Sequence, residues 1–136
     1  MAQSTSKPTV VWLAGIIDIA LIVLFVLIGR RSHGEALSLA GLLTTLWPFL
    51  VGLAVGWLIT RAWRHPLGPV WPGVVVWVST VMLGMLLRLV SGQGVEWTFV
   101  LVATIAVGVF LLGWRAIAAL VRAVRGRSST SANPSP

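Results

Sequence analysis

The chain has 136 residues, of which 57% are apolar and only 10% are charged, and its formal net charge is +7. A soluble domain is nearer half apolar and a quarter charged, so this composition excludes an ordinary soluble protein. The basic residues lie in short loops and at the ends of apolar runs, which is typical of membrane proteins and argues against nucleic-acid binding. Cysteine is absent, which excludes disulfides and cysteine-ligated metals.

Four apolar runs have the length of a membrane-spanning helix, and they cover residues 10–29, 37–60, 69–90 and 97–114. Twenty helical residues reach about 30 Å, the thickness of the hydrocarbon core of a bilayer. The first run is too long for a signal peptide and no cleavage site follows it, so we expect an uncleaved helix. The sequence therefore predicts an all-α, polytopic membrane protein, a four-transmembrane-helix bundle with short loops that has the lipid bilayer as its first partner.

Three further segments lie outside these runs. Residues 1–9 form a short polar segment before the first run. Residues 115–127 keep a helical pattern with arginines on one face, which predicts a basic amphipathic helix. Residues 128–136 have few apolar side chains and are predicted to be disordered. The arginines expected to bind anionic lipid are Arg115, Arg122, Arg125 and Arg127.

The distribution of basic residues predicts the orientation. Four spans place both termini on one side of the membrane, and that side carries seven basic residues: Lys7, Arg61, Arg64, Arg115, Arg122, Arg125 and Arg127. The other side carries three, Arg30, Arg31 and Arg88. Because cytoplasmic loops carry the excess of Lys and Arg, we expect both termini in the cytoplasm and the protein in the plasma membrane, the prokaryotic inner membrane.

The second run contains a proline and a glycine motif. Pro48 removes a backbone hydrogen bond and predicts a kink, and Thr44 and Thr45 are close enough to supply a donor to the carbonyl that it frees. Gly52 and Gly56 form a G-x-x-x-G pattern. That pattern permits close helix packing, within the bundle or between two copies.

Asp18 is the one charged residue inside the first run, where a bare carboxylate is costly. It lies about 12 Å from the start of the run, a depth shared by Ser79 and Thr80. Thr45 and Trp47 approach the same level from the second run, so we expect Asp18 to hydrogen-bond within this polar set. Two interpretations stay open: a proton-linked or cation-binding carboxylate, and a structural clamp between helices.

A second group of charges is expected at the opposite side of the membrane from the termini. Its members are Arg30, Arg31, His33, Glu35, Arg88 and Glu96. We expect Arg88 to extend to the surface and pair with Glu35 or Glu96, with a direct pair to Asp18 as the lesser alternative. This cluster is either a site for an anion, a lipid head group or a partner, or a solvated helix end.

Enzyme chemistry finds little support in the sequence. The spans contain a single carboxylate, no base lies near Ser79, and no phosphate-binding glycine loop is present. His33 and His65 are expected on opposite faces of the membrane, so we predict neither a metal site nor a haem, and no cofactor. The leading interpretation is a non-enzymatic accessory or interaction protein that packs with itself or with a larger membrane complex. The alternative is an oligomeric, proton-coupled transporter of small solutes that uses Asp18.

A series of short motifs resembles a known family. In chain order they are Asp18, Gly29-Arg30, His33, Trp47-Pro48-Phe49, Gly56-Trp57, Gly84, Arg88, Phe99 and Gly113-Trp114-Arg115. Their order is similar to that in the uncharacterised prokaryotic family of small membrane proteins catalogued as domain of unknown function 3054. The resemblance covers roughly residues 10–115. It implies a four-span membrane protein, and it implies no activity, substrate or cofactor.

Overall fold

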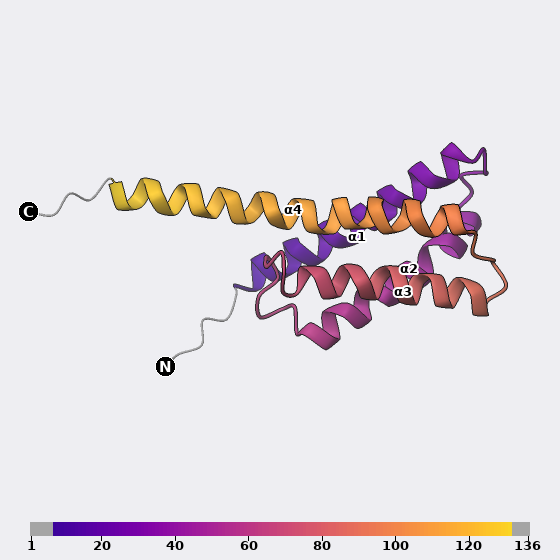
Figure 1. Cartoon of the computed structure of the whole chain (residues 1–136), viewed down its shortest axis with the longest axis horizontal. Helices are drawn as coiled ribbons and strands as arrows, with labels where there is room; N and C mark the ends of the chain where they lie inside the picture. Colours follow the sequence, from indigo (N-terminus) through magenta and orange to yellow (C-terminus); the bar gives the residue numbers. More distant parts are fainter. Residues whose placement is uncertain (1–6, 132–136) are drawn as a thin grey trace, which may run out of the picture.

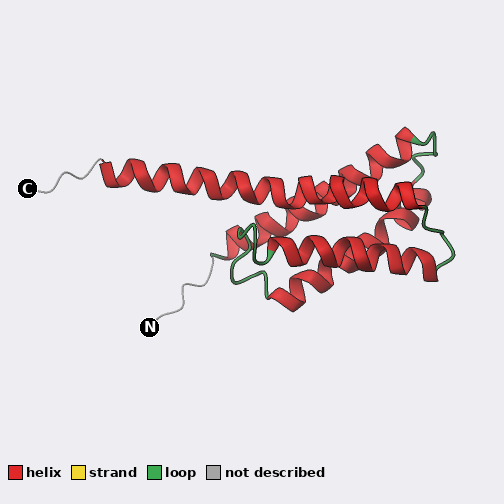
Figure 2. Ribbon diagram, viewed as in Figure 1, coloured by secondary structure: helices red, strands yellow, loops and turns green. Residues whose placement is uncertain are grey.

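The computed structural model describes residues 7–131, with side chains to residue 128, and every regular element in that part of the chain is a helix (Figures 1 and 2). The helices are α1 (Pro8–Ser32), α2 (Leu39–Thr60), α3 (Gly73–Val90) and α4 (Trp97–Ser131). Each is long and apolar enough to cross a membrane. The predicted fold class is therefore confirmed: the protein is an all-α, four-span membrane protein.

The connections between the helices define two ends of the bundle. The end with the start of α1 and the α2–α3 connection, residues 61–72, is called the proximal end here. The end with the other two connections, residues 33–38 and 91–96, is the distal end. The helices pack in a ring in which α1 contacts α2 and α4, and α3 contacts α2 and α4.

The boundaries of the helices follow local chemistry. Ser38 is the N-cap of α2, because its hydroxyl accepts a hydrogen bond from the Gly41 N–H at 3.1 Å. Arg61 ends α2 in a left-handed backbone conformation (φ 50°). The third apolar run starts at residue 69, but α3 begins only at Gly73, because Pro72 has no N–H and takes the position before the helix.

The helix α4 is longer than the predicted fourth span. It has 35 residues and continues without a break through the predicted basic helix, residues 115–127. Residues 128–131, which were expected to be disordered, form its last turn. Figure 1 shows the C-terminal part of α4 extending beyond the other helices at the proximal end. The rest of the predicted tail, residues 132–136, and residues 1–6 of the predicted N-terminal segment lie outside the described residues.

The glycine motif of α2 brings α2 and α3 into close contact. A Cβ atom on Gly52 would lie 2.8 Å from the Thr80 Cα, and one on Gly56 would lie 2.9 Å from the Val76 Cα. The Ser79 hydroxyl donates to the Gly52 carbonyl at 2.8 Å. In this structure the motif therefore packs helices within the chain, one of its two predicted uses.

The carbonyl freed by Pro48 finds a donor that the sequence did not indicate. That carbonyl belongs to Thr44, and it accepts from the Gln93 side-chain amide at 3.0 Å. The expected donors, the hydroxyls of Thr44 and Thr45, instead donate to the carbonyls of Ala40 and Gly41. A side chain from the α3–α4 connection therefore repairs the interrupted hydrogen-bonding pattern of α2.

Candidate functional site

Asp18 lies completely buried in α1, where its carboxylate accepts four hydrogen bonds. Arg115 of α4 donates from Nη1 to Oδ1 at 2.8 Å and from Nη2 to Oδ2 at 2.7 Å. The indole N–H groups of Trp57 and Trp114 donate to Oδ2 and Oδ1, each at 2.8 Å. We call these four residues the Asp18 centre. A carboxylate has about four lone-pair positions, so its capacity to accept is filled.

Arg115 is also completely buried, and all three of its guanidinium nitrogens donate. Besides its two bonds to Asp18, Nε donates to the Pro66 carbonyl at 3.0 Å and Nη1 to the Leu111 carbonyl at 3.1 Å. Pro66 lies in the α2–α3 connection and is itself buried. The Asp18 centre therefore ties α1, α2, α4 and the proximal connection together.

This arrangement has a clear electrostatic consequence. A charge in low-dielectric surroundings is tolerated when it is paired and hydrogen-bonded. A bidentate ion pair, in which two guanidinium nitrogens donate to the two carboxylate oxygens, is the most favourable geometry for arginine and a carboxylate. The centre holds one negative and one positive charge, so it is neutral as a unit. Its contacts are those of a clamp between helices, and each oxygen of the carboxylate accepts two hydrogen bonds.

The partners that the sequence predicted for Asp18 lie elsewhere. Ser79 donates to α2, and Thr80 donates to the Val76 carbonyl of its own helix. Thr45 belongs to the distal end, where its hydroxyl accepts from Arg30, and Trp47 is 40% exposed on the outside of the bundle. The expectation was wrong because depth along a helix gives the level of a side chain but not the direction in which it points.

Sequence reasoning missed Trp57 and Trp114 and misplaced Arg115. The sequence analysis did not name the two tryptophans as partners of Asp18, and it assigned Arg115 to a lipid-binding face with Arg122. Arg115 is instead buried against Asp18, so it does not belong to a lipid-binding surface. One signal in the sequence could have identified Arg115 as the partner of Asp18. A buried acid requires a cation, and Arg115 is the cation that follows directly on the fourth span.

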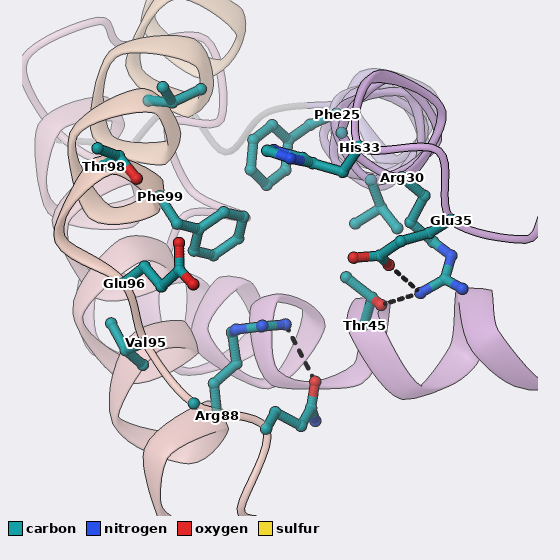
Figure 3. A pocket seen from close by; sticks show the side chains of 15 residues that line it. Phe25, Arg30, His33, Glu35, Thr45, Arg88, Val95, Glu96, Thr98 and Phe99 are labelled. Atoms are coloured by element: carbon teal, nitrogen blue, oxygen red, sulfur yellow. Dashed lines mark hydrogen bonds and ion pairs between the residues drawn. The ribbon is translucent and has the colours of Figure 1, made fainter.

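The distal end brings most of the second predicted cluster around one cavity of about 390 Å³. Figure 3 shows the side chains that line it, from α1, α2, α3, α4 and both distal connections. The charged and titratable members of the lining are Arg30, His33, Glu35, Arg88 and Glu96. Arg31 is exposed and does not line the cavity. Phe25 and Phe99 form the aromatic part of the wall. We call this space the distal cavity.

Arg30 is held at the rim of the distal cavity by four contacts. It pairs with Glu35 at 2.9 Å and donates to the Thr45 hydroxyl at 2.9 Å. Its Nε and Nη2 both donate to the Ala36 carbonyl, at 3.0 and 2.7 Å. The charges of Arg30, in the last turn of α1, and Glu35, in the α1–α2 connection, therefore neutralise each other.

The guanidinium of Arg88 makes fewer hydrogen bonds than that of Arg115. Its Nη1 donates to the Gln93 side-chain carbonyl at 3.0 Å, and its guanidinium lies 4.7 Å from the centre of the Phe99 ring. Its Nε is buried and has no hydrogen-bond partner in the described part of the chain. The expected ion pair with Glu35 or Glu96 does not form, and neither does the alternative pair with Asp18, because Gln93 lies closer and Arg115 already occupies Asp18.

The remaining predicted lipid-binding arginines lie on the part of α4 beyond the bundle. Arg122, Arg125 and Arg127 are exposed there. The same stretch presents exposed apolar side chains, Ile117, Leu120, Val121 and Val124. Residues 116–131 extend about 24 Å past the level of Arg115. We call this stretch the α4 extension.

Comparison with known proteins gives one result. The family described as "Protein of unknown function (DUF3054)" matches residues 15–118, which is more than half of the chain and includes the Asp18 centre and the distal cavity. No curated protein and no solved structure matches the chain. The resemblance noted from the sequence motifs is therefore confirmed, and this chain belongs to the DUF3054 family.

Proposed function

We propose that this protein is a non-enzymatic accessory or interaction protein of the plasma membrane, which acts by helix packing with itself or within a larger membrane complex. The observation that carries the proposal is a shallow apolar groove between α3 and α4. Trp77, Gly108, Leu112, Gly113 and Ala116 are among its lining residues. Small residues on a membrane helix allow a second helix to approach closely.

The construction of this groove supports its use as a contact surface. The Trp77 indole N–H donates inward to the Thr104 carbonyl at 2.9 Å, so the ring presents only apolar atoms to the outside. A Cβ atom on Gly113 would meet nothing within 4 Å. The floor of the groove at Gly113 is therefore open, and a side chain there would fill space that a partner helix needs.

The Asp18 centre supports this proposal over a transporter that uses Asp18. A proton carrier must exchange partners at its carboxylate, and here Arg115 and two indoles fill the positions that an exchanging proton or solute requires. The role that best fits these contacts is to hold α1, α2 and α4 together.

The orientation and the lipid contact are part of the same proposal. We place the proximal end in the cytoplasm, because seven of the ten basic residues belong to it. The α4 extension then meets the cytoplasmic leaflet, and Arg122, Arg125 and Arg127 bind anionic lipid there while its apolar face meets the acyl chains.

The test of the packing proposal is purification of the tagged protein from its own membrane in mild detergent, with mass spectrometry of co-purifying subunits and a native mass for the particle. We expect a stoichiometric second subunit or a defined homo-oligomer. Gly113→Leu should disperse that assembly, whereas Ala20→Leu, on the exposed side of α1, should leave it intact. A monomer without a stoichiometric subunit from the wild-type chain would refute the proposal.

The lipid contact is tested by trypsin cleavage at Arg122 and Arg125 in nanodiscs. We expect slower cleavage in discs with phosphatidylglycerol than in discs of phosphatidylcholine, and a loss of the difference in high salt, because ionic attraction to a charged surface is screened. Equal cleavage in both kinds of disc would show that the α4 extension does not bind anionic lipid.

A further inference from the structure

We propose that the distal cavity binds a phosphoethanolamine-type zwitterion, with its phosphate on Arg88 and its ammonium on Glu96. Two sources carry this chemistry, a phosphatidylethanolamine head group and a free phosphoethanolamine-like solute. The cavity has a volume of about 390 Å³, which lies in the range of small-molecule sites. The proposal is independent of the packing function, because it concerns the distal end and not the α3–α4 groove.

The balance of charge in the cavity favours a zwitterion over a simple anion. Arg30 and Glu35 form an ion pair at 2.9 Å and offer no net charge. The charged groups left in the lining are one cation, Arg88, and one anion, Glu96. Within residues 7–128 Glu96 forms neither an ion pair nor a side-chain hydrogen bond. Figure 3 shows both side chains extending into the cavity.

Arg88 has one edge of its guanidinium available for an anion. Gln93 accepts from Nη1, which leaves Nε and Nη2, the two nitrogens that lie on the same edge and bind phosphate or carboxylate together. The buried Nε has no acceptor among the described residues, and a buried donor without an acceptor is unfavourable. The guanidinium lies 4.7 Å from the centre of the Phe99 ring, and in the proposed complex the Nε and Nη2 edge binds the phosphate.

The apolar lining explains how one end of the ligand reaches the lipid. Phe25, Val26 and Val102 line the cavity between α1 and α4, and Val102 is 58% exposed on the outside of the bundle. A phospholipid could place its head group on Arg88 and Glu96 while its acyl chains pass Val102 into the membrane. A free zwitterion would use the polar part of the same cavity.

The experiment uses the full-length protein in maltoside detergent. Thermal unfolding, followed by the fluorescence of the chain's eight tryptophans, is recorded with rising concentrations of phosphoethanolamine, inorganic phosphate or ethanolamine. Native mass spectrometry compares retention of phosphatidylethanolamine and phosphatidylglycerol. We expect phosphoethanolamine to bind more tightly than phosphate or ethanolamine, or phosphatidylethanolamine to be retained over phosphatidylglycerol. The first result assigns a soluble ligand and the second alone assigns a lipid.

Two variants separate the two halves of the site. Arg88→Gln should weaken binding of the zwitterion and of inorganic phosphate by about tenfold to hundredfold, the usual effect of a charge-assisted hydrogen bond. Glu96→Gln should weaken binding of the zwitterion by a similar factor and leave binding of inorganic phosphate unchanged. Arg31→Gln, a neighbouring exposed arginine outside the cavity, should change neither.

Three results would overturn the proposal. The first is that phosphoethanolamine binds no more tightly than phosphate or ethanolamine and that phosphatidylethanolamine is not retained over phosphatidylglycerol. The second is that both cavity variants bind the zwitterion as the wild type does. The third is that Arg31→Gln weakens binding of the zwitterion as much as the cavity variants do. Glu96 is exposed in the α3–α4 connection, so Glu96→Gln decides the question even if Arg88→Gln lowers the yield of folded protein.

Discussion

The proximal and distal ends of the bundle each hold an arginine against a cluster of polar groups, and they use it in opposite ways. At the proximal end Arg115 is completely buried, and all its nitrogens bond to Asp18 or to backbone carbonyls. At the distal end Arg88 is half-buried beside a cavity, and its Nε lacks an acceptor within the described chain. A filled polar cluster holds helices together, whereas an incompletely filled one beside a cavity can take a ligand.

The difference between the two ends changes how the role of an acidic residue inside a membrane span is interpreted. Asp18 is the most conspicuous residue of the sequence, and intramembrane acids are often functional. Here four donors fill the lone pairs of its carboxylate, so we propose that Asp18 contributes to stability. The residues with remaining binding capacity, Arg88 and Glu96, lie at the end of a span and in a turn, where sequence alone gives less reason to look.

The largest expected effect comes from breaking the Asp18 centre. Arg115→Met removes the cation and leaves the Asp18 carboxylate buried without it, which should cost about 3–5 kcal/mol of unfolding free energy. Chemical unfolding followed by tryptophan fluorescence measures the loss, and Arg122→Met on the exposed α4 extension is the matched control. Equal stability of the two variants would remove the contrast between the two ends.

A smaller effect is expected from the link between the distal turn and α2. Gln93→Ala removes the acceptor of Arg88 and the donor to the Thr44 carbonyl, so it should cost about 1–3 kcal/mol. The same unfolding measurement applies. Thr98→Ala, which changes another polar residue of the cavity lining, should have little effect. If Gln93→Ala were neutral, the carbonyl freed by Pro48 would not depend on this turn.

The smallest change in stability is expected at Arg88 itself. Arg88→Gln removes one side-chain hydrogen bond and one ring contact but also the unpartnered Nε, so the net loss should stay within about 1 kcal/mol. A loss as large as that of Arg115→Met would identify Arg88 as a second clamp and contradict its assignment to a binding site.

The four-span architecture could be predicted from the sequence because it depends on the length and apolarity of continuous runs, which are local properties. The gathering of Arg30, Glu35, Arg88 and Glu96 at one end follows in the same way, because short loops between spans leave few places for them.

The contacts of the Asp18 centre could not be predicted in this way. They depend on which faces of α1, α2 and α4 point at one another, and periodicity does not give that direction when a helix is apolar all round. Trp57 and Trp114 are also typical of an aromatic belt at the interface, which concealed their role as donors. Gln93 was missed because its acceptor, Thr44, lies far away in the sequence.

A double-mutant cycle at Asp18 and Arg115 tests the central claim most directly, that this buried pair is a structural clamp. Unfolding free energies are measured for Asp18→Leu, Arg115→Met and the double variant. The clamp predicts that each single variant is strongly destabilised and that the double variant is more stable than either, because no uncompensated charge remains. If the losses of the two single variants simply added in the double variant, the pair would not be coupled and the claim would be wrong.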